Sequence, residues 1–544
     1  MLKKQLLLFL LLTFWLIGET ARDYLKLAIN SSEKGFYELS NKYLEEYIAR
    51  NEKEFLDLAF LIYGYNLLKL EKYKEAKEKF EIILLQFPLS PYIKDTYTFL
   101  IITCLKIDET QQSLKYYKDY KTKFGKTEEL EKQIGNYFLQ KGIFHFKNKN
   151  FLEAKYIFNF ILEEFKEKNI LSWTNYYLGL IEFEKNNFKE ALSYFEKVIY
   201  FGEEEMFFDS KLKTGDCYFN LGEYEKAEKY YKELIVEKDN IFSEWAKFQT
   251  AMIEKRKGNF KKAEEILKNI KPLNEDLKFN KLNELAGIYI LLENWDTAEN
   301  TLNEILKEFP EKKEISEIYF KLGIVNFNKR NFENSIQFLQ KTLLISNENP
   351  LIKEKSLFFL GYIYYLKKNF NESFKYWDTL KNLYPESEFL PQILFLKGKK
   401  LYQENQFKEA EEVFKELVEK ENSIYFEDSC IYLLEILIKR KKFEEGEKYA
   451  KKLLEKKKND KFDFYLGKIY YLKGEYEKAE KIFKDLKIDD SSLKVEITFY
   501  LGDIYKKKKD YEKAKEKFIE IISLYPQFKE WKELAENSLK ELKN

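Results

Sequence analysis

The residue types that most often perform catalysis or bind metals are rare in this chain of 544 residues. His145 is the only histidine, and the three cysteines, Cys104, Cys217 and Cys430, lie far apart in the sequence. A single histidine provides no histidine pair for a metal site and argues against a serine or cysteine triad. Carboxylates are so abundant that no pair stands out. The sequence therefore predicts no catalytic residue, no cofactor and no metal site.

One stretch imitates the end of a phosphate-binding loop. Phe124-Gly125-Lys126-Thr127 has the final glycine, lysine and threonine, but Tyr120 stands where the first glycine is required. We therefore interpret it as a turn between helices. His145 and the three cysteines are interpreted as buried residues that pack between helices.

The dominant feature of the sequence is a repeat that runs through nearly the whole chain. In its clearest copy Gly502 is followed by Tyr511, Ala514 and Phe518, at nine, twelve and sixteen residues. We name the first small position of each copy the marker, the aromatic position the plug and the last, bulky position the filler. Fourteen markers are present: Ala28, Gly64, Ile101, Gly142, Gly179, Gly215, Ala251, Ala286, Gly323, Gly361, Gly398, Leu434, Gly467 and Gly502.

The residue twelve positions after the marker is small in every copy. The clearest pairs of small residues are Gly142 with Ala154, Gly179 with Ala191, Gly215 with Ala227, Gly467 with Ala479 and Gly502 with Ala514. Around them apolar residues recur at three and four positions, which indicates two helices with one buried stripe each. A constant offset predicts that the two helices approach closely at the small residues. One hairpin cannot bury its apolar face alone, so the pattern predicts stacked hairpins with a continuous core.

These residues resemble the tetratricopeptide repeat family. Leu466, Gly467, Tyr470, Ala479 and Phe483 match its signature almost completely, and the copy from Leu501 to Pro526 does so as well. The resemblance implies an all-α, right-handed superhelical solenoid of about 14 hairpins over residues 22–528. Residues 529–544 are expected to form a helix that caps the last hairpin. The family shares an architecture rather than a ligand, so the resemblance implies binding but names no partner.

The N-terminus has the pattern of a targeting segment. Lys3 and Lys4 precede an uncharged, mostly aliphatic run from Leu6 to Ile17, which is short for a membrane span. Residues 1–21 are therefore expected to be a cleaved signal peptide or, alternatively, an uncleaved membrane anchor. Either implies an exported protein of the periplasm or of the membrane-associated cell envelope.

Charge is balanced, with 94 basic and 93 acidic residues. A net basic field for nucleic acid is absent. The interspersed charges are typical of solvated helix faces.

The resemblance implies that the first helix of each hairpin lines a concave groove. Positions three before, one after and four after the marker would then face inward, and in the ninth to eleventh repeats they are mostly aromatic. We expect an apolar partner-binding patch there, although aromatics at these places also pad neighbouring hairpins. The candidate groove residues are Phe320, Ile324, Phe327, Phe358, Tyr362, Tyr365, Phe395 and Tyr402.

The position directly after the marker changes character along the chain. It is Ile324 and Tyr362 in the ninth and tenth repeats and charged in the last four. An apolar patch is therefore followed by a charged stretch.

Taken together, these features of the sequence predict a non-catalytic scaffold of the bacterial envelope that binds peptide or helix segments of other proteins. The alternative is a subunit that binds polysaccharide or peptidoglycan during export or assembly. Repeat junctions such as Tyr384-Pro385-Glu386-Ser387 are similar to those of outer-membrane assembly lipoproteins and of the Tol-Pal-associated coordinator.

Overall fold

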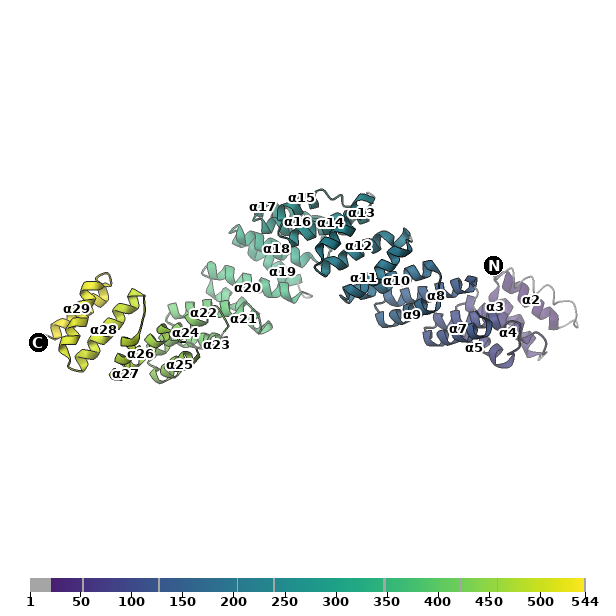
Figure 1. Cartoon of the computed structure of the whole chain (residues 1–544). Helices are drawn as coiled ribbons and strands as arrows, with labels where there is room; N and C mark the ends of the chain where they lie inside the picture. Colours follow the sequence, from purple (N-terminus) through teal and green to yellow (C-terminus); the bar gives the residue numbers. More distant parts are fainter. Residues whose placement is uncertain are drawn as a thin grey trace. The chain divides into compact units, whose positions relative to one another are not determined.

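The computed structural model describes residues 21–50, 53–125, 128–202, 204–237, 240–345, 349–420, 422–456 and 458–542. Within these ranges the chain forms 29 helices and no strand (Figure 1). The all-α prediction is confirmed. The predicted signal peptide or anchor, residues 1–21, lies outside the described residues except for Ala21. No helix of the described part has both the length and the apolar composition of a membrane span.

The helices fall into two compact units, Met1–Leu292 and Glu293–Asn544. The prediction of one uninterrupted solenoid stays a prediction. In the first unit the first helices of successive pairs are α2 (Ala21–Glu33), α4 (Leu56–Lys69), α6 (Ile93–Lys106), α8 (Glu128–Lys147), α10 (Lys168–Glu184), α12 (Glu204–Asn220), α14 (Ile241–Arg256) and α16 (Glu275–Leu291). The second helices are α3 (Tyr37–Ala49), α5 (Tyr73–Gln86), α7 (Thr110–Phe124), α9 (Phe151–Glu164), α11 (Phe188–Phe201), α13 (Tyr224–Glu237) and α15 (Phe260–Lys268).

The second unit begins with α17 (Trp295–Glu308) and continues with six pairs. Its first helices are α18 (Ile315–Asn328), α20 (Pro350–Leu366), α22 (Leu390–Gln403), α24 (Phe426–Lys439), α26 (Asp460–Lys473) and α28 (Ser491–Lys507). Its second helices are α19 (Phe332–Ile345), α21 (Phe370–Leu383), α23 (Phe407–Val418), α25 (Phe443–Lys456), α27 (Tyr476–Asp485) and α29 (Tyr511–Leu524). The chain ends in α30 (Lys529–Glu541), which packs on α28 and α29 and places Trp531 5.2 Å from Phe499 between ring centroids.

The plug was expected in the turn between the two helices, and the structure places it at the start of the second helix. In all fourteen copies the plug is the first residue of that helix, including the irregular Thr110. The close approach at the small residues is also confirmed. The Ser335 hydroxyl donates to the Gly323 carbonyl at 2.7 Å, and the Ser40 hydroxyl donates to the Ala28 carbonyl at 2.7 Å.

The filler position explains why most markers are glycine. A Cβ on Gly361 would lie 2.3 Å from Trp377 Cδ1, and one on Gly142 would lie 2.4 Å from Phe158 Cε1. The filler ring thus occupies the space that a marker side chain would need. In most copies the pairing is complementary in volume: the alanine markers Ala28, Ala251 and Ala286 have Leu44, Leu267 and Leu302 as fillers, and the large marker Leu434 has Ala450. Ile101 with Tyr117 is an exception. All of these residues are buried.

Each turn inside a pair contains one residue in the left-handed region, seven positions after the marker. Only four of these fourteen turn residues are glycine. The turn ends the first helix with a Schellman-type bond, for example from Asn187 N–H to the Glu182 carbonyl at 2.8 Å. Elsewhere this strained position carries side chains such as Glu71, with a φ of 60°, and Lys149, with a φ of 59°.

We expect Glu71→Gly and Lys149→Gly each to stabilise the protein by about 0.5–1 kcal/mol, because glycine removes the left-handed strain but loses more chain entropy on folding. Chemical denaturation monitored by circular dichroism measures the gain. The control is Lys115→Gly, an exposed position inside α7, which should cost about 1 kcal/mol. Destabilisation at all three positions would contradict the assigned turn geometry.

Candidate binding surface

The first helices form the more tightly packed layer of each unit. Successive first helices such as α24 and α26, or α18 and α20, contact each other directly. Successive second helices of the described chain have no comparable contact. In a curved stack of hairpins the crowded layer lies on the inner side. The first helices therefore provide the inner face of each unit, and the candidate groove residues all lie on them, on α18, α20 and α22.

The aromatic residues four positions after the marker are mainly structural. Each packs against the plug of its own turn, as Tyr365 does on Phe370, with 5.4 Å between ring centroids, and Tyr402 on Phe407, with 5.6 Å. The same contact is made by Phe146 with Phe151, Phe183 with Phe188, Phe219 with Tyr224, Phe327 with Phe332 and Tyr471 with Tyr476. These rings fasten the turn and yet stay partly exposed, as Phe327, Tyr365 and Tyr402 do, so their part in binding stays a prediction.

The aromatic residues three positions before the marker are also committed to packing. Phe358 is only 6% exposed and stacks on Phe389 at 4.4 Å between centroids. Phe395 is partly buried and stacks on Tyr425 at 4.8 Å, while Phe320 is partly buried against Phe359 at 6.3 Å. Phe358 was expected to anchor a partner; its accessibility is contradicted, since the start of the next first helix covers its ring. A glutamate there would bury a charge and unfold the region rather than test binding.

In the ninth and tenth repeats the position directly after the marker keeps its side chain partly accessible. Ile324 and Tyr362 are both partly exposed, although Tyr362 also stacks on Phe358 at 6.0 Å between centroids. These two residues form what we name the apolar step of the inner face. Of the eight predicted groove residues only Phe358 is buried, so a partner can reach the apolar step and the partly exposed rings beside it.

Beyond the apolar step the same position is charged. Glu435 accepts hydrogen bonds from the hydroxyls of Tyr402, at 2.7 Å, and Tyr465, at 2.5 Å, and Asp503 accepts one from Tyr471 at 2.8 Å. Burial, and then the nearby carboxylate, raise the pKa of each of the three tyrosines, so they stay protonated donors. The carboxylates thus join neighbouring first helices. Tyr402, predicted as a groove residue, has this role.

The residues considered for catalysis, His145 and the three cysteines, are buried in the helix packing. His145 is 5% exposed, and its Nε2 lies 3.2 Å from Asp108 Oδ1, which Lys141 Nζ also approaches at 2.6 Å. The three cysteines are buried, and burial raises the pKa of Cys104 and of Cys217 to about 12. In the described part of the chain no cluster of histidine, cysteine and acidic residues could hold a metal ion.

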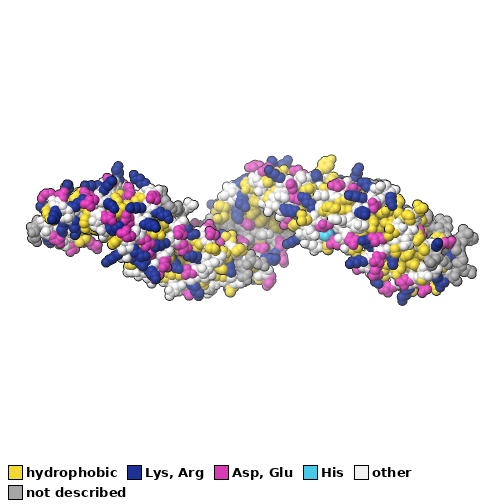
Figure 2. Space-filling view, turned by 90° about the horizontal axis from the view of Figure 1, so that it is seen from below, with side chains coloured by type: hydrophobic (Ala, Val, Ile, Leu, Met, Phe, Trp, Pro, Cys, Tyr) yellow, Lys and Arg dark blue, Asp and Glu magenta, His cyan; other side chains and the backbone are white. Residues whose placement is uncertain are grey.

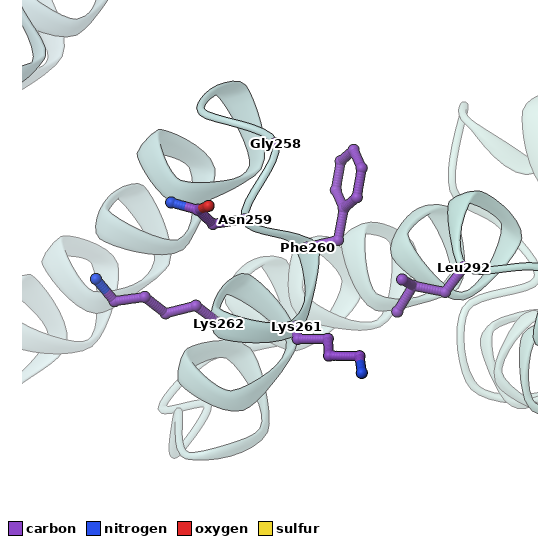
Figure 3. Close-up of a pocket in the computed structure, with 6 residues that line it drawn as sticks. All are labelled: Gly258, Asn259, Phe260, Lys261, Lys262 and Leu292. Carbon is purple, nitrogen blue, oxygen red and sulfur yellow. The ribbon is translucent and has the colours of Figure 1, made fainter.

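An open depression of about 500 Å³ lies on the first unit (Figure 3). It is lined by Gly258, Asn259, Phe260, Lys261, Lys262 and Leu292. Lys262 is bonded to Glu254 at 2.8 Å, and Phe260 is the plug of its turn. The depression therefore brings together turn residues with no arrangement for catalysis. On the second unit, the face of helices α22–α29 mixes charges of both signs (Figure 2).

Comparison with known proteins identifies the type of repeat but no ligand or partner. No curated protein sequence matches the chain. The C-terminal part of a TPR repeat-containing protein from Cytophaga hutchinsonii is 16% identical, with a TM-score of 0.36, and the match covers 46% of this chain and 96% of that one. A structure of Naa15/Naa10 bound to HypK-THB is 13% identical, with a TM-score of 0.32, and covers 89% of this chain and 78% of that one. Such low TM-scores indicate nothing about ligands.

A family model matches two segments, residues 209–237 and 498–527, which include the hairpin of Gly215 and the hairpin of Gly502. Both segments contain the marker, the plug and the filler in the predicted order. Residues 209–237 and 498–527 of this chain are tetratricopeptide repeats.

Proposed function

We propose that the chain is a non-catalytic scaffold that binds a segment of another protein on the inner face of its second unit. Tetratricopeptide repeats generally mediate protein–protein interactions. The observation that carries the proposal is the apolar step: Ile324 and Tyr362 stay partly exposed on adjacent first helices, and Phe327 and Tyr365 on the same helices are partly exposed as well. Apolar side chains held on rigid helices beside a polar rim suit capture of a peptide or helix.

The envelope setting is part of the proposal. The support is Lys3 and Lys4 followed by the aliphatic run to Ile17. A protein so exported would scaffold components of the periplasm or of the membrane-associated envelope, and the N-terminal segment could attach it to the membrane.

The test compares affinity capture from envelope extract by the tagged parent and by the Ile324→Glu, Tyr362→Glu double variant. The control variant is Lys307→Glu, Lys481→Glu, at two exposed positions on the second helices α17 and α27. We expect the apolar-step variant to lose at least tenfold of one or more captured proteins, since an anchor in a pocket is typically worth 2 kcal/mol or more, roughly a thirtyfold change. The control should retain them, and circular dichroism should be equal for all three proteins.

Equal capture by the apolar-step variant would contradict the proposed site. Capture that survives protease digestion of the extract would indicate a glycan ligand instead, which is the alternative function.

A further inference from the structure

One edge of the second unit carries two rows of basic residues with different environments. The first row lies six positions after the marker, at the end of each first helix. There Lys329, Arg440, Lys473 and Lys508 each pair with a glutamate of the preceding pair of helices: Glu299 at 2.6 Å, Glu411, Glu447 at 2.5 Å and Glu480 at 2.7 Å. This row is used to fasten successive pairs of helices.

The second row lies one position further, at the left-handed residue of the turn. It contains Arg330, Lys368, Lys441 and Lys509, with φ between 56° and 64°. All four side chains are exposed, and none forms an ion pair with a residue that the structure describes. We name these four residues the free basic row.

The residues of the free basic row have a left-handed backbone conformation, which is energetically unfavourable for any residue with a side chain. Glycine or asparagine would be more stable in the left-handed region, and two other turns of this unit do have Asn405 and Gly474 there. Acidic residues near the turns of the free basic row are already neutralised: Glu333 pairs with Lys367 at 2.5 Å, Glu444 with Lys473 at 3.0 Å and Asp510 with Lys513 at 2.7 Å. Stability of the unit therefore does not explain the four exposed cations.

Exposed leucines accompany these cations on the same edge. Leu366 is 44% exposed and lies two residues before Lys368, and Leu472 is 40% exposed in the turn that contains Gly474. Basic side chains interspersed with accessible leucine suit the headgroup region of an anionic bilayer, where phosphates attract the cations and the leucine enters the acyl boundary. An acidic polypeptide would satisfy the charges but would leave the leucines without a partner.

We propose that this edge of the second unit lies against an anionic membrane surface, through the free basic row and the neighbouring exposed leucines. The contact is peripheral and reversible. It uses the turns between the helices and leaves the apolar step on the inner face open, so membrane contact and segment binding are independent of each other.

The test is sedimentation of the protein with vesicles of phosphatidylglycerol and phosphatidylcholine in equal amounts, at low and at physiological ionic strength. The variant replaces Arg330, Lys368, Lys441 and Lys509 with glutamine, which keeps the backbone preference of the turn nearly unchanged. The control replaces Lys307, Lys448, Lys452 and Lys481, exposed residues of the second helices α17, α25 and α27, with glutamine. Both variants change the net charge equally.

We expect the parent and the control to bind the vesicles, binding to fall as salt is raised, and the free-basic-row variant to lose at least about tenfold of its partition, because each basic residue near an anionic surface contributes to the attraction. Equal loss in both variants would overturn the proposal in favour of unspecific charge attraction. No binding of the parent to these vesicles, or binding to poly-glutamate instead, would also overturn it. None of these three outcomes would affect the capture of partner proteins through the apolar step.

Discussion

Trp377→Ala is expected to destabilise the second unit by about 3–5 kcal/mol. Trp377 is 0% exposed, its ring fills the space above Gly361, and its Nε1 donates to the Phe358 carbonyl at 3.2 Å. Removing the ring leaves a cavity between two helices and removes the hydrogen bond from the ring nitrogen to the Phe358 carbonyl. Urea denaturation monitored by the helical circular dichroism signal, which does not depend on tryptophan, measures the loss of stability.

The partner substitution, Gly361→Leu, places a side chain where the ring already lies, and overpacking of this kind costs about 1–3 kcal/mol. The double variant Gly361→Leu, Trp377→Ala reproduces the arrangement of Leu434 with Ala450. We therefore expect it to be more stable than the sum of the two single effects predicts, by 1 kcal/mol or more. Strict additivity would contradict the volume complementarity between marker and filler.

Glu411→Gln is expected to cost about 2 kcal/mol. Glu411 is 3% exposed and is approached by Lys415 Nζ at 2.7 Å, Lys442 Nζ at 2.7 Å and Arg440. Loss of one member of a fully buried ion pair costs roughly 3–5 kcal/mol. These cations are about one-third exposed, and water screens them, so we expect the smaller value.

The effect of Glu411→Gln should depend on pH. Burial alone would raise the pKa of Glu411, but hydrogen bonds from Lys415 and Lys442 outweigh it and hold the pKa below its ordinary value. A carboxylate with a lowered pKa stabilises the folded state above the ordinary carboxyl pKa, and this stabilisation is lost as the pH falls. The difference between parent and variant should therefore be largest near pH 7 and shrink on acidification. Glu412→Gln, an exposed position on the same helix, should change stability by less than about 0.5 kcal/mol at either pH.

The sequence predicts the helical pairs because their determinants are local. The marker, the plug and the small residue twelve positions on repeat without insertion, and a plug such as Phe370 marks the first residue of its helix. The role of the filler could also have been predicted from the sequence. Ala450 is a small filler where most copies have a bulky one, and its marker, Leu434, is large where most markers are small.

The candidate site was predicted less well, and the reason is physical. An aromatic residue on the inner side of a first helix can point to solvent or can cover a neighbouring ring, and spacing alone does not distinguish the two. Phe358 is covered by Phe389, which belongs to the next pair and lies beyond a turn of variable length. Ile324 and Tyr362, by contrast, stay partly accessible.

The most direct test of the inner-face proposal is site-specific photo-crosslinking in the source cells. A benzophenone amino acid replaces Tyr362 in one protein and Lys448, an exposed residue of the second helix α25, in another. We predict a discrete crosslinked protein from position 362 and none from position 448. Crosslinks of equal yield from both positions, or only from position 448, would contradict binding on the inner face.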